Sequence, residues 1–155
     1  LMFSKYYPDS GSRYREFASL ITDTYKSTSL NGVGLFPDAE RCIERLLEDG
    51  RSLGIVSNSY MEQITEIMER IGITDKFASV VGRDRVAFAK PDPEPVLLCL
   101  KEMGASRRDS VMVGDSINDV LAGKGAGLST VLINRYGEDI SCDDCDTRIG
   151  SLDEL

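Results

Sequence analysis

Three clusters of polar residues in this sequence carry groups that could bind a phosphate and a metal ion. Ser57 and Asn58 directly follow a short apolar run and offer a hydroxyl and main-chain amides. Lys90, in a later loop, offers an ammonium, and Asp115, after another apolar run, offers a carboxylate. Hydroxyls, amides and a cation suit phosphate oxygens, whereas a carboxylate suits a hard metal ion such as magnesium. Together the clusters would form a site for phosphoryl chemistry.

Each cluster also has a plainer explanation. Serine is favoured in turns at strand ends, which would account for Ser57, and most lysines are solvated, which would account for Lys90. Ser116 and Asp119 have the spacing of a capping box, and Asp115 could favour the helix dipole without touching a metal ion. The functional interpretation rests on the order and spacing of the three clusters taken together.

The elements that must position these clusters alternate in type along the chain. Helical spacing and glycine stops predict helices over Asp38–Gly50, Ser59–Ile71 (with a capping box of Ser59 and Glu62), Asp92–Met103, and from Asp115 to about Lys124 before a turn Gly125-Ala126-Gly127. Short β-branched runs predict strands over Ser52–Val56, Ser79–Gly82, Ser110–Val113 and Ser129–Ile133. This alternation predicts an α/β fold with a doubly wound parallel sheet.

A doubly wound sheet would bring the polar clusters to one edge. Ligands bind beyond the carboxyl ends of parallel strands, where loops and helix N-termini converge. Ser57 and Asp115 each follow a predicted strand, and Lys90 lies between a predicted strand and the next helix. We therefore expect the three clusters to lie on the same rim.

Composition excludes several classes of function. The 155 residues, 41% of them hydrophobic, can build one globular domain. The formal charge of −8, from 26 acidic and 18 basic residues, would repel a nucleic-acid backbone. Apolar stretches are only of strand length and no secretory signal is visible, so we expect no membrane partner and a cytoplasmic location. The absence of histidine excludes Ser-His-Asp and Cys-His catalysis and histidine-ligated zinc.

The four cysteines do not suggest a metal or redox centre. Cys42 and Cys99 fall on apolar helix faces and are interpreted as small core residues. Cys142 and Cys145 form a Cys-Asp-Asp-Cys sequence, but no second pair completes a four-thiolate site and no helix follows a strand there. We expect a polar surface loop at this pair, whose role the sequence leaves undefined.

Three motifs resemble those of hydrolases of the haloacid dehalogenase superfamily, particularly the group similar to phosphoglycolate phosphatase. Ile55-Val56-Ser57-Asn58 resembles the second motif of that family, Lys90-Pro91-Asp92-Pro93 the third, and Val113-Gly114-Asp115-Ser116-Ile117-Asn118-Asp119 the fourth. Small residues at Ala122-Gly123 and Ala126-Gly127 and the ending Ser151–Leu155 are similar as well. Any one motif would be weak, but three in order are specific. The resemblance implies a Rossmannoid α/β core over residues 36–155.

The resemblance also implies an activity and residue roles. The family's phosphatases use magnesium and an aspartyl-phosphate intermediate to hydrolyse a small phosphorylated metabolite. By the motifs, Ser57 and the main-chain amide of Asn58 would hold the phosphate oxygens, and Lys90 would neutralise the nucleophile and the transferring group. Asp115 would bind magnesium directly or through water, and Asp119 would support Lys90 or the metal shell. These roles suit phosphoryl transfer, which depends on positioning and charge neutralisation.

The family's first motif, Asp-x-Asp-x-Thr, which supplies the nucleophile, has no match in these residues. Asp144 and Asp146 have its spacing but lie in a polar stretch. In the family this motif follows a central strand, so the sheet would lack its middle and leave two strand edges unpaired. We therefore expect a preceding segment of the polypeptide to carry it. Residues 1–35, with a helix over Ser12–Lys26, would be the last part of a small helical cap and its hinge.

Other functions share parts of this pattern. A relative that lost its nucleophile would bind phosphate without turnover, and a phosphoglucomutase could share the scaffold. The acidic stretch from Asp115 to Asp119 argues against a dehalogenase, which binds no metal ion. A receiver domain is disfavoured by the order of the motifs. Receiver domains carry their acidic residues on early strands and their lysine on the last strand, whereas the order here is Ser57, Lys90, Asp115. The sequence defines neither the substrate nor the oligomeric state.

Overall fold

The computed structural model describes residues 34–137, 142 and 144–155. The chain divides into two compact units, residues 1–34 and 35–155, and the described residues belong almost entirely to the second. The predicted helix over Ser12–Lys26 and nearly all of the predicted cap lie outside the described residues. Both stay predictions.

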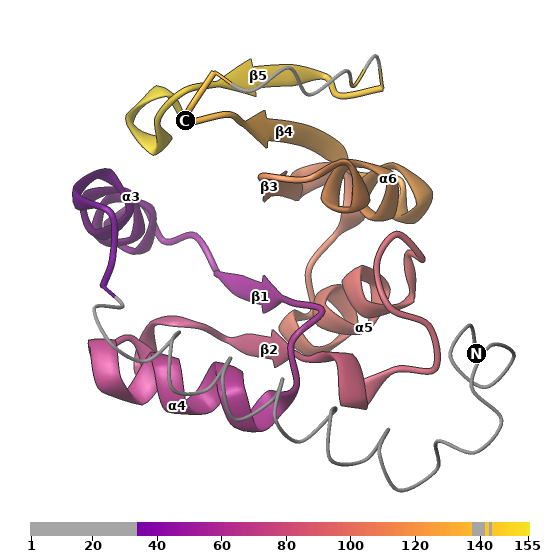
Figure 1. Cartoon of the computed structure of the whole chain (residues 1–155), viewed down its shortest axis with the longest axis horizontal. Helices are drawn as coiled ribbons and strands as arrows, with labels where there is room; N and C mark the ends of the chain where they lie inside the picture. Colours follow the sequence, from indigo (N-terminus) through magenta and orange to yellow (C-terminus); the bar gives the residue numbers. More distant parts are fainter. Residues whose placement is uncertain (1–33, 138–141, 143) are drawn as a thin grey trace, which may run out of the picture. The chain divides into compact units, whose positions relative to one another are not determined.

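The described part of the second unit alternates strands with helices (Figure 1). The strands are β1 Gly54–Val56, β2 Ser79–Val81, β3 Val111–Gly114, β4 Ser129–Ile133 and β5 Thr147–Ile149, and the α-helices are α3 Pro37–Glu48, α4 Met61–Ile71, α5 Glu94–Met103 and α6 Ile117–Ala126. Short 3₁₀ helices include η2 Arg83–Arg85 and η4 Leu152–Glu154. Among the described helices, none has the length and apolar character needed to cross a membrane.

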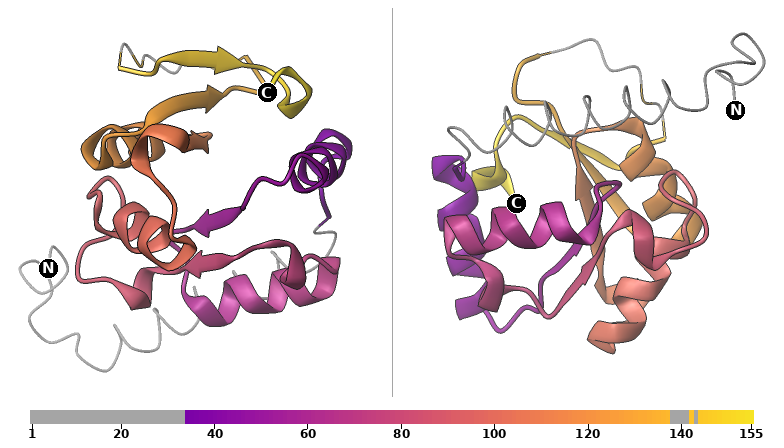
Figure 2. Two further views of the ribbon diagram at one scale, coloured as in Figure 1. Left: turned by 180° about the vertical axis from the view of Figure 1, so that it is seen from behind. Right: turned by 60° about the horizontal axis from the view of Figure 1, so that its bottom comes forward.

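The strands form two parallel sheets. β1 pairs with β2, with Ile55 opposite Val80. The second sheet has the order β3-β4-β5, with Val113 opposite Val131. Figures 1 and 2 show the two groups standing apart, with β1 and β3 at the facing edges. The parallel pairing confirms the predicted α/β class, although the described strands make two sheets in place of one.

Helices cover both faces of the β1–β2 sheet. Ile55 and Val80 pack against the core of α4, which includes Ile64. Ser79 precedes Val80 and so faces the opposite side, where its Oγ donates to Oε2 of Glu102 in α5 at 2.7 Å. Helices on both sides are what parallel strands need, because such strands are buried on both faces.

Helices α5 and α6 pack against each other and so join the two sheets. α5 lies on β1 and β2, and α6 lies on β3 and β4. Their shared buried core consists of Val96, Leu100, Ala122, Ala126 and Leu128. Gly123 lets α6 approach its sheet closely, because a Cβ at this position would lie 2.7 Å from Cγ2 of Thr130. One face of the unit therefore carries a continuous layer of helices.

Asp38, near the start of α3, connects the beginning of the described unit with its C-terminal end. Its Oδ2 accepts hydrogen bonds from Nη1 of Arg135 at 2.6 Å, Oγ of Ser151 at 2.8 Å and the main-chain N of Leu152 at 2.8 Å. The Arg135 guanidinium also stacks over the ring of Phe36, 4.2 Å from its centroid. The helix that precedes β1 is thus tied to the segment that follows β5.

The predicted cap of α4 is wrong, although the predicted stops are correct. Gly50, Gly72 and Gly104 take positive φ values at or just after the ends of α3, α4 and α5. The capping box of Ser59 and Glu62 does not form, because α4 begins at Met61. The main-chain N–H of Met61 instead donates to Oδ1 of Asp84 in η2 at 2.9 Å. A side chain from a distant segment thus caps α4 together with a local one, since Oε1 of Gln63 accepts from the main-chain N of Tyr60 at 3.4 Å.

The predicted turn after α6 begins too early. The helix continues through Gly125 and Ala126, and only Gly127 leaves it, with φ 81°. Glycine is a poor helix former, but Ala126 is fully buried in the core shared with α5. Burial of this residue therefore outweighs the local preference for a turn.

The predicted surface loop at the C-terminal cysteine pair is wrong for Cys142. This residue is 2% exposed and packs against Val120 of α6, and Cys145 is half-buried beside it. β5, which no sequence pattern predicted, pairs with β4 and draws this segment onto the unit. The predicted core residues Cys42 and Cys99 are both buried.

Candidate active site

Lys90 is held at the carboxyl end of β1 by two oxygen atoms. Its Nζ donates to the main-chain O of Val56 at 2.7 Å and to Oδ1 of Asp119 at 2.6 Å. The side chains of Lys90 and Asp119 are 10% and 7% exposed. The lysine is therefore a nearly buried, fixed cation, unlike the solvated surface lysine that the sequence also allowed.

Asp119 serves the helix cap and the lysine at once. Its Oδ2 accepts hydrogen bonds from the main-chain N of Ser116 at 3.1 Å and from Oγ of Ser116 at 2.7 Å. This is the predicted capping box, and Oδ1 is left to bind Lys90. The structural and functional interpretations of this carboxylate are thus compatible.

Asn58 and Ser57 lie beside this lysine, at the end of β1. The Asn58 amide binds the main chain of Lys90, since Nδ2 donates to Lys90 O and Oδ1 accepts from Lys90 N, both at 3.0 Å. Oγ of Ser57 accepts from the main-chain N of Ser59 at 3.1 Å. Two of the predicted clusters therefore meet in space.

Asp115 directly follows β3 and is exposed. It lines the same cavity as Lys90 and Asp119. An exposed carboxylate that lines the same cavity as a fixed ammonium provides both signs of charge, as binding of a phosphate together with a cation requires. The third predicted cluster thus faces the same space as the other two.

The cavity that these residues share has a volume of about 1200 Å³. It is lined by residues 51–56, which lead into and include β1, and by residues 108–115, which lead into and include β3. The cavity therefore runs along both facing strands, from their amino ends to the polar residues at their carboxyl ends. We call this space the strand slot.

The described part of the chain gathers no cluster of metal-ligating side chains at this site. Within residues 34–137, 142 and 144–155, no group of three or more acidic, cysteine or histidine side chains could hold a metal ion. Asp115 offers one hard oxygen ligand, and both oxygens of Asp119 are already bound. The donor chemistry fits magnesium, which binds through one or two carboxylates and otherwise keeps its waters.

Sequence reasoning missed three features of the site. The main-chain O of Val56 binds the lysine, and the Asn58 side chain binds main chain rather than solvent.

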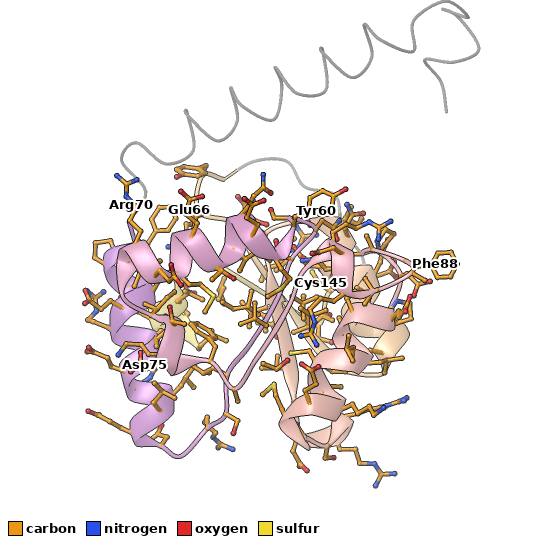
Figure 3. All side chains as sticks on the ribbon, turned by 90° about the horizontal axis from the view of Figure 1, so that it is seen from below. Tyr60, Glu66, Arg70, Asp75, Phe88 and Cys145 are labelled. Carbon is orange, nitrogen blue, oxygen red and sulfur yellow. The ribbon has the colours of Figure 1, made fainter. Side chains whose placement is uncertain are left out.

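Exposed aromatic residues also flank the motifs: Tyr60 is 59% and Phe88 65% exposed, and Figure 3 shows Phe88 projecting away from the ribbon. Their exposure could not be read from the sequence, because apolar residues next to a motif are more often buried.

Comparison with known families decides what these motifs belong to. Residues 3–133 match a family model described as haloacid dehalogenase-like hydrolase. The chain belongs to the haloacid dehalogenase-like (HAD-like) hydrolases. All five candidate site residues, Ser57, Asn58, Lys90, Asp115 and Asp119, lie within the matched range of this HAD-like chain. The resemblance inferred from three motifs is thereby confirmed.

Individual relatives of the HAD-like chain agree with this family. A phosphoglycolate phosphatase from Salmonella typhi is 33% identical over 144 residues, which cover 91% of this chain and 57% of the relative. A crystal structure of a HAD phosphatase from Thermococcus onnurineus is 34% identical, with a TM-score of 0.73, covering 78% of this chain and 56% of that one. A predicted phosphoglycolate phosphatase from Haemophilus somnus shares the fold, with a TM-score of 0.83 at 23% identity over 92% of this chain and 64% of its own. The chain spans about half the length of the curated relatives it matches.

Proposed function

We propose that this chain is the phosphate-binding and metal-binding part of a phosphatase that hydrolyses a small organic phosphomonoester. The observation that carries the proposal is the position of Lys90. Its ammonium is nearly buried and fixed between Val56 and Asp119, at the end of the strand slot that Asp115 also lines. A fixed, partly desolvated cation of this kind stabilises the charge of a transferring phosphoryl group.

The strand slot supports the proposal that another segment of the polypeptide supplies the nucleophile. β1 and β3 face the slot along their lengths, and among the described strands each pairs with a neighbour on its other side alone. An unpaired strand edge leaves main-chain donors and acceptors without partners. A parallel strand in the slot would satisfy both edges, and a carboxylate after its last residue would lie near Lys90 and Asp115.

In the proposed reaction, the carboxylate of that strand attacks the phosphorus atom and the ester P–O bond breaks. The leaving alkoxide takes a proton from a general acid on the same strand and departs as the alcohol. Water then attacks the phosphorus atom of the aspartyl-phosphate, which breaks the acyl O–P bond, frees the carboxylate, releases inorganic phosphate and returns a proton to the general acid. Lys90 neutralises the attacking carboxylate and the phosphoryl oxygens, and Asp119 holds Lys90 in place. Oγ of Ser57 and the main-chain N–H of Asn58 bind the phosphoryl oxygens.

Asp115 is the proposed magnesium ligand from this chain. Magnesium supplies neutralisation of the phosphate charge when it is bound. Because magnesium prefers octahedral oxygen coordination, the remaining ligands would come from the strand in the slot, from the phosphate and from water. The exposure of Asp115 supports this role, since its carboxylate is available to a metal ion.

The substrate class proposed is a small phosphorylated metabolite, with phosphoglycolate first among candidates. The matched relative from Salmonella typhi is a phosphoglycolate phosphatase, at 33% identity. The net charge of −8 disfavours nucleic acid, and a local cation such as Lys90 can still hold a small anion.

The test is release of inorganic phosphate by the whole polypeptide, with the slot-filling segment, from a panel of small phosphomonoesters that includes phosphoglycolate. We expect turnover that requires magnesium and is lost on chelation. Asp115→Asn should reduce turnover at least about 100-fold, because it removes a charged metal ligand.

A control and two contrary outcomes define the test. Glu66→Gln changes an exposed acid on α4, labelled in Figure 3, and should leave turnover unchanged. Turnover that persists fully without a divalent metal ion would contradict the proposal. Tight binding of inorganic phosphate with no hydrolysis of any ester would instead identify a non-catalytic phosphate-binding relative, and interconversion of sugar phosphates a mutase.

A further inference from the structure

The side chain of Asn58 forms a two-point contact with the main chain of Lys90. Nδ2 donates to Lys90 O and Oδ1 accepts from Lys90 N, both at 3.0 Å, across 32 residues of sequence. The orientation of the amide is fixed by this pair, because a main-chain N–H must face an oxygen and a carbonyl must face a donor. One side chain thus copies the hydrogen-bonding pattern of a neighbouring strand.

This contact complements the one that holds the lysine ammonium. Val56 O, two residues before Asn58, accepts from Nζ of Lys90 at 2.7 Å. The segment 56–58 therefore holds both ends of Lys90, the main chain through an amide and the ammonium through a carbonyl. Since Lys90 lies in a loop between η2 and α5, its main chain does not belong to a strand ladder that could place it.

We propose that Asn58 is a positioning residue for Lys90, rather than a residue whose side chain binds the substrate. This inference rests on the proposed function and deepens it. The Asn58 side chain is exposed, so its hydrogen bonds serve local geometry more than the core. A lysine has a long, flexible side chain, and its ammonium can meet a phosphoryl group reproducibly only if its Cα is also fixed.

The kinetic consequence is a loss in kcat with little change in KM. Asn58→Ala removes both hydrogen bonds, and Asn58→Asp keeps the acceptor for Lys90 N but sets a second oxygen against Lys90 O. We expect kcat to fall roughly 10- to 100-fold for Asn58→Ala, since a small misplacement of a catalytic group has effects of this size. KM should change less than about 3-fold, and Asn58→Asp should lie between wild type and Asn58→Ala.

A double-mutant cycle separates positioning from direct substrate contact. If Asn58 acts through the lysine, Asn58→Ala should cost almost nothing once Lys90→Ala has been introduced. An equal fold-loss in kcat in both backgrounds would overturn the inference, because it would mean that the asparagine acts on the substrate by itself. Glu66→Gln, in α4, serves as the control for unspecific effects in both backgrounds.

A second measurement does not depend on turnover. Acetylation of lysine amines by a limiting amount of acetic anhydride, followed by mass spectrometry, reports how well each amine is held and shielded. The Lys90 side chain is only 10% exposed, so it should react slowly in wild type and severalfold faster in Asn58→Ala. Lys76 and Lys101 should react equally in both proteins, which controls for global unfolding.

The two measurements distinguish failure of the inference from failure of the proposed function. Faster acetylation of Lys90 in Asn58→Ala, in a protein that hydrolyses no phosphomonoester, would support the positioning contact and contradict the phosphatase. Unchanged acetylation of Lys90 in both Asn58→Ala and Asn58→Asp would overturn the positioning role even in an active phosphatase.

Discussion

Lys90 and Asp119 are 29 residues apart in the sequence, yet Nζ of the lysine lies 2.6 Å from Oδ1 of the aspartate. Lys90 belongs to the loop that follows β2, whereas Asp119 lies in the first turn of α6, after β3. The ion pair therefore connects an element of one sheet with an element of the other. Both charges are nearly buried, so each depends on the other for neutralisation.

Asp119→Asn should destabilise the fold as well as reduce activity. The substitution leaves a nearly buried ammonium without its counter-charge, which typically costs about 3 to 5 kcal/mol. We expect a loss at the lower end, about 3 kcal/mol in the free energy of unfolding, because the asparagine amide oxygen can still accept the hydrogen bond from Nζ of Lys90. Urea denaturation of the variant and wild type measures it.

Asp115→Asn is the matched control for this prediction. Its carboxylate is exposed, so the free energy of unfolding should change by less than about 0.5 kcal/mol. The pair of variants separates two roles, since both should lose turnover and only one should lose stability. Equal stability of the two variants would contradict the buried ion pair as described.

Asp38 should make stability depend on pH only in strongly acidic solution. The hydrogen bond from Arg135, helped by those from Leu152 and Ser151, holds the pKa of Asp38 well below its ordinary value of 3.8, and burial opposes this only partly. A carboxylate with a lowered pKa stabilises the folded state above its unfolded pKa. That stabilisation declines as the pH falls below about 4, towards the folded pKa.

Asp38→Asn tests this dependence. The difference in unfolding free energy between wild type and variant should be constant from about pH 7 to 5 and shrink steadily below about pH 4. Asp153→Asn is the control. The ion pair between Asp153 and Arg41 is exposed, with 51% of the Asp153 side chain and 60% of the Arg41 side chain accessible, so it should contribute little to the free energy of unfolding at any pH. A difference that grew with acidity would refute the assigned sign.

Cys142→Ser should destabilise the protein although its neighbours in sequence are polar. Its thiol is 2% exposed and packs against Val120 and Leu132, so a hydroxyl there would enter an apolar site. We expect a loss of about 1 to 3 kcal/mol in the free energy of unfolding. Cys145→Ser, at a half-buried position, should cost less than about 1 kcal/mol. Similar losses for both would place the two cysteines in equivalent surroundings, contrary to the structure.

Local features of the fold were predictable from the sequence. The strand Ser129–Ile133 has its predicted bounds, since the β-branched and apolar residues from Thr130 to Ile133 suit burial on both faces of a parallel sheet. The helix stops at Gly72 and Gly104 are correct as well, because these residues reach positive φ without steric cost. The capping box of Ser116 and Asp119 follows from spacing within one turn.

Contacts between distant segments were not predictable in the same way. Asp84 caps α4 across 23 residues, and no local pattern distinguishes it from an ordinary loop acid. Cys142 lies among polar residues, and only the pairing of β5 with β4 carries it into the core. In both cases the deciding contact is tertiary, and local propensity carries no information about it.

The sequence by itself determined the chemistry available at the candidate site: a hydroxyl, a lysine and two carboxylates at the ends of alternating strands and helices, in the order of the HAD-like family. Only the tertiary structure decided how they meet. It joins Lys90 to Asp119 and turns the Asn58 amide towards main chain. It also opens the strand slot between β1 and β3. The physical reason is that a polar side chain looks the same in sequence whether water or a distant main-chain group satisfies it, and only folding makes that choice.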